Sequence, residues 1–236
     1  MENNFENKYE RTELLIGEDN VEKLSSFKVA IFGIGGVGGF VSEALARSGI
    51  GTFYLFDNDI VSKSNINRQI VALNSTIGKY KVDIMKDRIN DINENAKVYT
   101  NIIFVDKENI DSIDFNEFDY VIDCIDSIEG KVEIIKKCKE LNKNIISSMG
   151  AGNKLDPTKF EVSDIYKTHV CPLAKRMRQE LKKENIDSLK VVYSTEEPIK
   201  INYEIDVKKH PPGSISFVPS VCGLIIAGEV IKDLIK

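Results

Sequence analysis

The sequence predicts an α/β fold in which helices cover both faces of a mostly parallel β-sheet. Short apolar segments alternate with amphipathic segments along the first two thirds of the chain, which is typical of βαβ units. A glycine-rich turn follows the first apolar segment, as it does in Rossmann-like, doubly wound sheets. The 236 residues, of which 42% are hydrophobic and 29% charged, suffice to bury one large core. We therefore expect one domain over residues 1–236.

The alternating part of the chain ends near Gly150. Apolar runs bounded by turn residues predict strands, and apolar residues at helical spacing predict helices. The helix after the glycine turn is expected to end at Gly49, because glycine is favoured just beyond a helix. The strands are expected at 28–33, 51–57, 96–104, 118–126 and 143–150, and the helices at 37–48, 77–95 and 127–142.

The C-terminal third follows a different pattern. Two antiparallel strands are expected on either side of a basic helix, at 159–168, 189–196 and, for the helix, 172–185. The Pro-Pro-Gly run at 211–213 predicts a turn before the last apolar segment. That segment contains Pro219 and ends at Glu229, so it is too short to span a bilayer. We expect it to form a buried terminal helix.

Composition argues against several classes of protein. The net charge of −5 provides no general attraction for nucleic acid, so any such contact must be local. The polar N-terminus lacks the apolar run of a signal peptide, which favours a reducing, cytoplasmic location without membrane attachment. The four cysteines form no C-x-x-C pair, so no zinc is expected.

The glycine-rich turn predicts a phosphate site. Gly33, Gly35 and Gly38 have the G-x-G-x-x-G spacing, which lets backbone N–H groups and a helix N-terminus approach a phosphate. Asp57 ends the next strand, where a carboxylate can accept hydrogen bonds from ribose hydroxyls. Both an NAD-dependent oxidoreductase and an ATP-using enzyme fit these residues, and a turn made for packing alone is the lesser alternative.

Three charged residues further along the chain favour the ATP-using enzyme. Arg68 and Lys81 follow the second strand and can return to the carboxyl edge of the sheet. Breaking a phosphoanhydride requires neutralisation of the charge on pyrophosphate, which such cations supply. Asp126, just past a later strand, can hold a divalent metal, whereas Asp123 lies inside the apolar run and is expected to be structural.

Four segments in this order, GIGGVGG, LFDNDIVSKSNINRQ, IGKYKV and DCIDS, resemble the E1-like adenylating enzymes of the ThiF/MoeB type. These include the activators of bacterial sulfur carriers. The resemblance implies that Asp57 holds ribose, that Asn65, Arg68 and Lys81 contact phosphates, and that Asp126 binds Mg²⁺. The implied ATP-binding residues are Gly33, Gly35, Gly36, Gly38, Asp57, Asn65, Arg68, Gln69 and Lys81. Residues 1–150 would form the nucleotide-binding half.

Arg11, in YERTELLIG, matches the N-terminal arginine that such enzymes insert into the site of the partner subunit. The resemblance therefore implies a homodimer in which Arg11 joins Arg68, Lys81 and Asp126 as a catalytic residue. Proteins of a sulfur-transfer system are further candidate partners.

The C-terminal third resembles one branch of the family. Residues 147–183 and 213–235 are similar to the tRNA threonylcarbamoyladenosine dehydratases, whereas the sulfur-carrier activators usually hold zinc through two C-x-x-C pairs that this chain lacks. The branch activates the threonine carboxylate of a modified base next to the anticodon, and ring closure gives a cyclic hydantoin. The substrate's own carbamoyl nitrogen is the nucleophile, so no protein thiol is required. Residues 151–236 would then face the substrate.

The basic helix is the candidate for tRNA binding. Lys175, Arg176 and Arg178 would contact phosphates of the anticodon stem, although the pattern alone also fits a solvated helix face.

The cysteines and one histidine are weighed separately. Cys171 precedes Pro172 at a helix start, where a thiolate can be stabilised, but no histidine motif accompanies it and an inert thiol is expected. Cys124 and Cys222 are expected in the core, and His210 in a loop.

Three alternatives remain at this stage. The first is an enzyme that adenylates the C-terminal glycine of a small ubiquitin-like sulfur carrier. The second is an NAD-dependent oxidoreductase, which leaves Arg68, Lys81 and Asp126 without a role. The third is a scaffold that binds ATP without chemistry.

Overall fold

The computed structural model describes residues 7–201 and 211–236. Within these ranges, seven strands form one sheet in the order β3-β2-β1-β4-β5-β7-β6. Neighbouring strands are parallel except β6 and β7, which pair antiparallel. The strands are β1 (Lys28–Phe32), β2 (Thr52–Phe56), β3 (Lys97–Asn101), β4 (Tyr120–Asp123), β5 (Asn144–Ser148), β6 (Phe160–Asp164) and β7 (Lys190–Ser194). The predicted doubly wound, mostly parallel sheet is confirmed.

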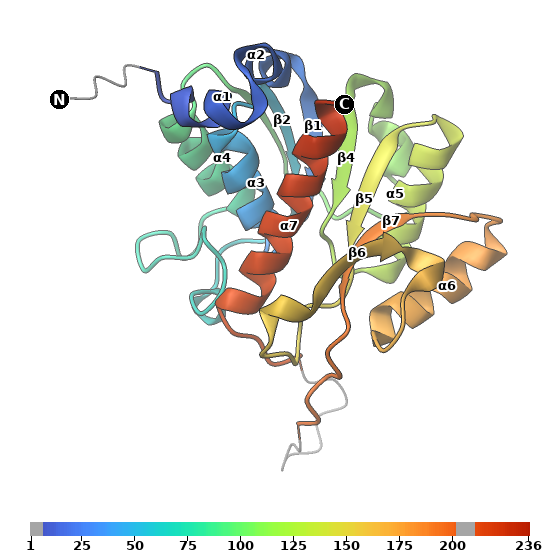
Figure 1. Cartoon of the computed structure of the whole chain (residues 1–236). Helices are drawn as coiled ribbons and strands as arrows, with labels where there is room; N and C mark the ends of the chain where they lie inside the picture. The colour runs from blue at the N-terminus through green and yellow to red at the C-terminus, as the bar shows by residue number, and fades with distance from the viewer. Residues whose placement is uncertain (1–6, 202–210) are drawn as a thin grey trace.

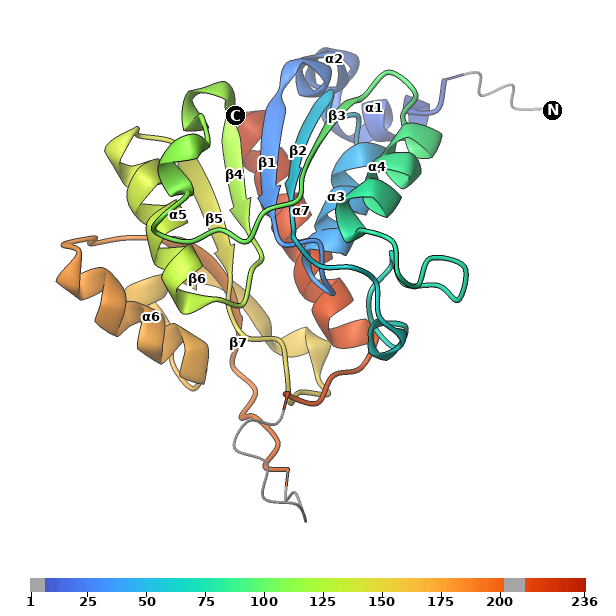
Figure 2. The same ribbon diagram turned by 180° about the vertical axis from the view of Figure 1, so that it is seen from behind.

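Helices cover both faces of the sheet. In Figure 1, α3 and α7 lie in front of the sheet, and Figure 2 shows α5 and α6 on the opposite face. The short helices α1 and α2 lie beyond the end of the sheet at which β1 begins. The helices are α1 (Glu10–Ile16), α2 (Glu18–Ser26), α3 (Gly38–Arg47), α4 (Lys81–Ile92), α5 (Ile128–Glu140), α6 (Pro172–Lys183) and α7 (Phe217–Leu234).

Two apolar cores sandwich the sheet because side chains alternate along each strand. In β1, Val29 and Ile31 belong to the core beneath α3, α4 and α7, whereas Ala30 and Phe32 belong to the core beneath α5 and α6. All four of these residues are fully buried. The central strands are therefore held from both sides, and their carboxyl ends form a rigid edge.

The C-terminal third extends the sheet as expected, with one addition. β6 and β7 pair antiparallel, with Val162 opposite Val192, and β7 is at the same time parallel to β5. The predicted terminal helix is also confirmed, because α7 buries residues such as Cys222, Ile226 and Val230. No helix in the described ranges is both long and apolar enough to cross a membrane.

Several boundaries differ from the sequence prediction. The helix expected from residue 77 begins at Lys81, because residues 61–79 form a loop closed by backbone bonds such as Val61 N to Lys79 O. The strand expected to reach residue 104 ends at Asn101. The helices α1 and α2 are not expected from the sequence, and α2 buries only Val21 and Leu24.

Candidate active site

A cavity of about 550 Å³ lies at the carboxyl ends of β1, β2 and β4. This is where the strand order reverses, the usual position of ligand sites in open α/β sheets. Most of the residues predicted to bind nucleotide line it, namely Gly33, Gly35, Gly36, Asp57, Asn65, Arg68, Gln69, Lys81 and Asp126. The fold thus brings together residues from three separate βα connections.

The glycines of the turn serve two different purposes. Gly33 has a φ of +88°, and a Cβ there would lie 2.9 Å from the Cys124 backbone. Gly38 is buried and does not line the cavity. A Cβ at this position would lie 1.8 Å from Gly33 O. Gly38 is therefore required for close packing, whereas Gly35 and Gly36 face the cavity.

Asp57 is fixed at the end of β2 by two backbone donors. Its Oδ2 accepts from Ile34 N at 2.6 Å, and its Oδ1 accepts from Asp59 N at 2.8 Å. Burial raises the pKa of Asp57, while the charge of Lys81 and the two backbone N–H groups act in the opposite direction. A carboxylate has about four acceptor positions, so Asp57 retains capacity for the two hydroxyls of a ribose.

Lys81 forms an ion pair that the sequence analysis missed. Its side chain is only 6% exposed, and its Nζ lies 2.6 Å from Asp59 Oδ2 and 4.0 Å from Asp57 Oδ1. The backbone reinforces this pair, because Lys81 N donates to Asp59 O at 3.1 Å. In the sequence, the only indication of this ion pair is that a second acidic residue, Asp59, stands two positions after Asp57. Asp59 is 60% exposed, so a phosphate can approach Lys81 beside it.

The turn between residues 62 and 69 presents Arg68 and Gln69. Asn65 Oδ1 accepts from Ser62 N at 3.0 Å and so closes the turn. Arg68 Nη1 donates to Ser64 O at 3.0 Å and to Asn67 Oδ1 at 2.9 Å, which leaves other guanidinium donors for an anion. Gln69 Oε1 is buried and has no hydrogen-bond partner in the described part of the chain. This oxygen is therefore available to accept a hydrogen bond from a bound ligand.

Asp126 lies on the loop after β4 and is exposed. Within residues 7–201 and 211–236, the Asp126 side chain has no hydrogen-bond or ion-pair partner. The same residues contain no group of three or more His, Cys, Asp or Glu that could hold a metal ion. Magnesium is usually held by one or two carboxylates together with substrate phosphates. Asp126 therefore fits the role of a carboxylate that holds Mg²⁺ only when phosphates are present.

Part of the cavity wall is apolar. Its apolar lining residues include Phe56, Ile103, Phe104, Val105 and Ile125. Such a surface suits a purine ring. The cavity wall thus combines apolar side chains, a carboxylate, cations and glycines, which are the kinds of group that bind the base, sugar and phosphates of ATP.

Several candidate residues lie outside the cavity. Arg11 is an exposed residue of α1, which Figure 1 places at the opposite end of the sheet. Lys175 and Arg176 are exposed on α6. Arg178 is half-buried and donates through Nη1 to Thr168 O at 3.0 Å and also to Thr168 Oγ1. The remaining candidate, His210, lies outside the described residues.

The cysteines offer no ready nucleophile. Cys171 is buried at the start of α6, as expected for an inert thiol. Cys124 follows the end of β4 rather than lying in the strand as expected, and it is partly buried, packing against the core while also lining the cavity. Burial raises the pKa of Cys124 well above its usual range, and raises that of Cys222 to about 12. The described part of the chain contains only free cysteines.

Residues 9–236 match the ThiF family. This chain belongs to that family. The ThiF-family chain is similar to the tRNA threonylcarbamoyladenosine dehydratase of Bacillus subtilis, with 45% identity over 240 residues that cover 97% of this chain and 94% of that protein. The resemblance drawn from the sequence motifs is therefore confirmed at the level of the family.

Solved structures show the same relationship. The chain is similar to the E. coli tRNA N6-threonylcarbamoyladenosine dehydratase in complex with ATP, with a TM-score of 0.88, 32% identity, and 96% of this chain and 93% of that chain covered. The complex of the same E. coli enzyme with AMP gives a TM-score of 0.88 and 32% identity, with 95% and 92% covered. The ThiF-family fold therefore extends over nearly the whole chain, including the segment after Gly150.

Proposed function

We propose that this protein uses ATP to dehydrate N6-threonylcarbamoyladenosine in tRNA to the cyclic hydantoin form, through adenylation of the threonine carboxylate. The main observation behind this proposal is the cavity, whose wall brings together apolar side chains, Asp57, the glycines of the turn and the cations Arg68 and Lys81. Support for the substrate comes from the B. subtilis relative, a tRNA threonylcarbamoyladenosine dehydratase that matches 97% of this chain. Residues 1–150 bind the nucleotide, and residues 151–236 complete the acyl side of the cavity.

The first chemical step forms the acyl adenylate. A carboxylate oxygen of the substrate attacks the α-phosphorus of ATP, and the bond to pyrophosphate breaks. Arg68, Lys81 and the N-terminus of α3 neutralise the negative charge that develops on the phosphates. Magnesium held at Asp126 would add further positive charge there. Asp57 keeps the ribose, and hence the α-phosphate, in a fixed position.

The second step closes the ring. The carbamoyl nitrogen attacks the activated carbonyl carbon, the carbon–oxygen bond to AMP breaks, and the nitrogen loses a proton. Nucleophile and electrophile belong to the same substrate, so correct placement supplies most of the rate. The protein has to hold the substrate and exclude water, because water would hydrolyse the adenylate.

Hydrogen bonds hold in place the part of the cavity wall that is proposed to face the acyl group of the substrate. Ala151, Gly152 and Pro212 line it together with Ser214 and Pro219. Asn153 holds the strap at 211–214, because its Oδ1 accepts from Gly213 N at 2.6 Å and its N donates to Gly213 O at 2.8 Å. Asn67 Nδ2 donates to Ser214 O at 3.0 Å from the nucleotide side. The strap therefore joins the two halves of the site.

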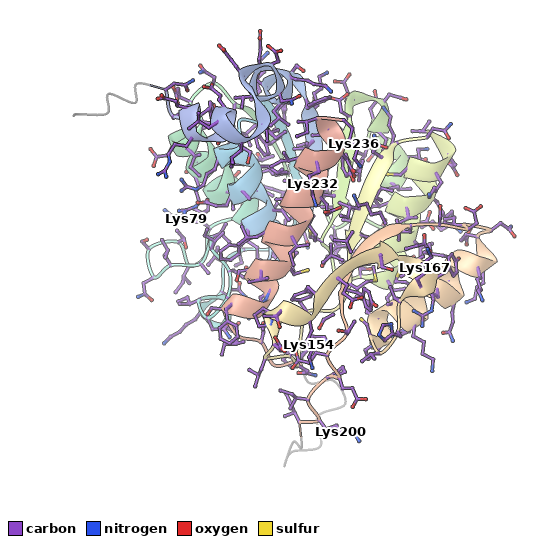
Figure 3. The ribbon with its side chains drawn as sticks, viewed as in Figure 1. Lys79, Lys154, Lys167, Lys200, Lys232 and Lys236 are labelled. Atoms are coloured by element: carbon purple, nitrogen blue, oxygen red, sulfur yellow. The ribbon has the colours of Figure 1, made fainter. Side chains whose placement is uncertain are left out.

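The tRNA is proposed to bind along α6 and the neighbouring edge of the sheet. Lys175 and Arg176 are exposed there, whereas one nitrogen of Arg178 is occupied by Thr168. Figure 3 shows Lys167 beside α6 and Lys200 beyond the carboxyl edge of the sheet. These four cations provide a local positive surface on a chain of net charge −5.

A homodimer completes the site in this proposal. Arg11 is at the opposite end of its own chain from the cavity, so it can act only in a second copy. Leu14 and Leu15 of the same helix are 79% and 85% exposed. Adjacent exposed leucines on a short helix favour burial against another protein surface. The partner would cover this face and receive Arg11.

Mass spectrometry of tRNA nucleosides tests the proposed reaction. The protein is incubated with ATP, Mg²⁺ and tRNA that carries threonylcarbamoyladenosine, and the tRNA is digested at neutral pH. We expect a nucleoside lighter by one water, formed only with ATP and lost in Asp126→Ala. An unchanged nucleoside, together with ATP–pyrophosphate exchange on a small ubiquitin-like carrier, would overturn the substrate while retaining the adenylation site.

A further inference from the structure

Two charged residues outside the cavity are completely buried. Asp123, at the end of β4, and Lys131, on α5, both have 0% side-chain exposure. Lys131 Nζ lies 3.0 Å from Asp123 Oδ2 and donates to Ser148 O at 2.8 Å and Ser147 Oγ at 3.3 Å. Ser147 Oγ donates to the same Asp123 oxygen at 2.6 Å. Every charge and donor in this cluster is thus satisfied without water.

The cluster lies directly beneath the loop that carries Asp126. Asp123 Oδ1 accepts from Ile125 N at 3.3 Å, one residue before Asp126. On the other side, Ser127 Oγ accepts from Gly130 N at 3.3 Å, and Ser127 O accepts from Lys131 N at 3.0 Å. The loop is therefore fastened at both ends to the Asp123–Lys131 pair or to the first turn of α5.

This fastening matters because the Asp126 side chain has no partner of its own among the described residues. Its carboxylate can be aimed only through the backbone on either side. A buried ion pair is rarely the most stable solution, since apolar residues of similar volume often stabilise a core equally well. Stability alone therefore gives no reason for burying two charges at this position.

We propose that the Asp123–Lys131 ion pair is a positioning pair, which holds residues 124–127 so that the Asp126 carboxylate faces the phosphates and metal of bound ATP. The proposal rests on the role of Asp126 in the proposed function. Asp123 and Lys131 touch neither substrate nor metal, and they act through Asp126. Groups that orient a metal-binding carboxylate typically change metal affinity 10- to 100-fold when they are replaced.

Nucleotide binding without turnover tests the proposal. A single replacement leaves a buried charge without its partner and can unfold the chain, so the informative variant is the double replacement Asp123→Leu/Lys131→Met. Its folding is checked by thermal melting, and its affinity for ATP is measured by calorimetry with and without Mg²⁺. We expect the affinity without Mg²⁺ to be unchanged and the additional affinity conferred by Mg²⁺ to fall about tenfold.

Two further variants separate the outcomes. Lys137→Met is the matched control, because Lys137 is on the same helix but pairs with the exposed Asp111, and it should behave as wild type. Asp126→Ala should lose the Mg²⁺-dependent affinity. If Asp126→Ala loses it and the folded double variant keeps it, only the positioning proposal is overturned. If Asp126→Ala keeps it, the role of Asp126 in the proposed function is wrong, and the positioning proposal is overturned with it.

Discussion

Lys81 is the residue whose environment most constrains the chemistry. It is almost fully buried, yet its closest partner, Asp59, is largely exposed. A buried ammonium beside an exposed carboxylate can exchange that carboxylate for an incoming phosphate without becoming unpaired. In the proposed function, the ion pair would hold the Lys81 ammonium in place until ATP binds.

We expect Lys81→Ala to lower the rate of ATP–pyrophosphate exchange by roughly 10²- to 10³-fold, because it removes a donor aimed at developing charge. Lys79→Ala is the control, since Lys79 is exposed on the preceding loop and does not line the cavity. Exchange measured with labelled pyrophosphate distinguishes the two. Equal rates in both variants would remove Lys81 from the mechanism.

Asp57 predicts a pH dependence for ATP binding. Burial raises its pKa above the usual 3.8, and protonation removes the negative charge and converts one acceptor position into a donor, so the ionised form accepts more strongly from the ribose hydroxyls. The affinity for ATP should therefore begin to fall at a higher pH than an ordinary aspartate would dictate. The free energy of unfolding should change with pH in the opposite direction to the affinity for ATP. The folded state binds this proton more tightly than the unfolded state, so ionisation of Asp57 at neutral pH lowers stability.

Calorimetric ATP titrations between pH 7 and pH 4.5 measure this effect. Asp57→Asn should bind more weakly at neutral pH and should lack the loss of affinity on acidification. A wild-type affinity that stays constant across this range would contradict the raised pKa.

At the level of residues, the sequence correctly placed in the cavity the residues that come shortly after a strand end. Gly35 and Asp57 are such residues and line the cavity, and Lys81 lines it from the start of α4. The partnership of Asp59 with Lys81 was missed, because the two are 22 residues apart and meet only through the loop closed at Lys79. Gly38 was expected to bind nucleotide, but the need for glycine there arises from contact with Gly33 O, which spacing does not show.

At the scale of elements, the cations of α6 are of two kinds: some are exposed to solvent, and one is engaged in hydrogen bonds within the chain. Lys175 and Arg176 extend into solvent, whereas Arg178 holds the loop before the helix through Thr168. The C-terminal end of α6 carries Lys182 and Lys183, which are also exposed. One helix therefore contains the test residues and their controls.

We expect Lys175→Glu/Arg176→Glu to weaken tRNA binding by about tenfold or more at moderate salt, and to reduce the slope of affinity against salt concentration. Lys182→Glu/Lys183→Glu makes the same change in charge at the other end of the helix and should have a smaller effect. Filter binding over a range of salt concentrations provides both values. Equal losses in the two variants would indicate a general charge effect rather than a site.

The terminal helix α7 is fastened to the sheet by a polar cluster around Asp233. Its carboxylate accepts from Tyr120 Oη at 2.7 Å and from Lys190 Nζ and Lys236 Nζ, each at 2.8 Å. Partial burial raises the pKa of Asp233, but these donors outweigh it and lower the pKa from 3.8 to about 2. The stabilisation by Asp233 is thus complete above about pH 4 and is lost as the pH falls towards 2.

Urea denaturation at pH 5 and pH 3 tests this tether. Asp233→Asn should be less stable than wild type at pH 5, and the difference should narrow at pH 3. Asp111→Asn breaks an exposed ion pair and should change little at either pH. A gap between Asp233→Asn and wild type that widens on acidification would contradict the lowered pKa.

Helices and strands could be predicted from the sequence where they have a clear run of apolar residues and clear boundary residues. β1 and α5 combine buried runs with clear boundaries and appear within two residues of the expected bounds, whereas β4 covers only Tyr120–Asp123 of the expected 118–126. The antiparallel pairing of β7 with β6 was expected, but its parallel pairing with β5 was not, because a strand's partners depend on tertiary packing. The helix α2 buries just two residues, so its apolar pattern was too weak to recognise.

At the scale of the whole molecule, two groups among the exposed apolar residues bear on assembly. Leu14 and Leu15 lie on α1, and the loop beside the cavity exposes Ile60, Leu73 and Ile77 by 51%, 56% and 43%. In a two-fold dimer, the α1 of each subunit can cover the loop of the other. Such an arrangement buries both apolar surfaces and brings Arg11 to the cavity of the partner.

Mixing two inactive variants tests whether each site is shared between subunits. Arg11→Ala and Lys81→Ala should each be inactive alone. When they are mixed under conditions that exchange subunits, half of the dimers contain one of each chain. In those dimers one site has both replacements, and the other has the native Lys81 of one subunit and the native Arg11 of its partner. Activity should therefore recover to about a quarter of the wild-type value.

If Arg11 acted in its own chain, every site in the mixed dimers would carry one replacement, and no activity would return. The control is Leu15→Glu, which places a charge on the exposed apolar face of α1 and should leave the protein monomeric in sedimentation. A monomeric Leu15→Glu that retains full activity would contradict the shared site. Recovery in the mixture together with loss in Leu15→Glu would establish that the dimer is the catalytic unit, because no single chain then holds Arg11 and Lys81 in one cavity.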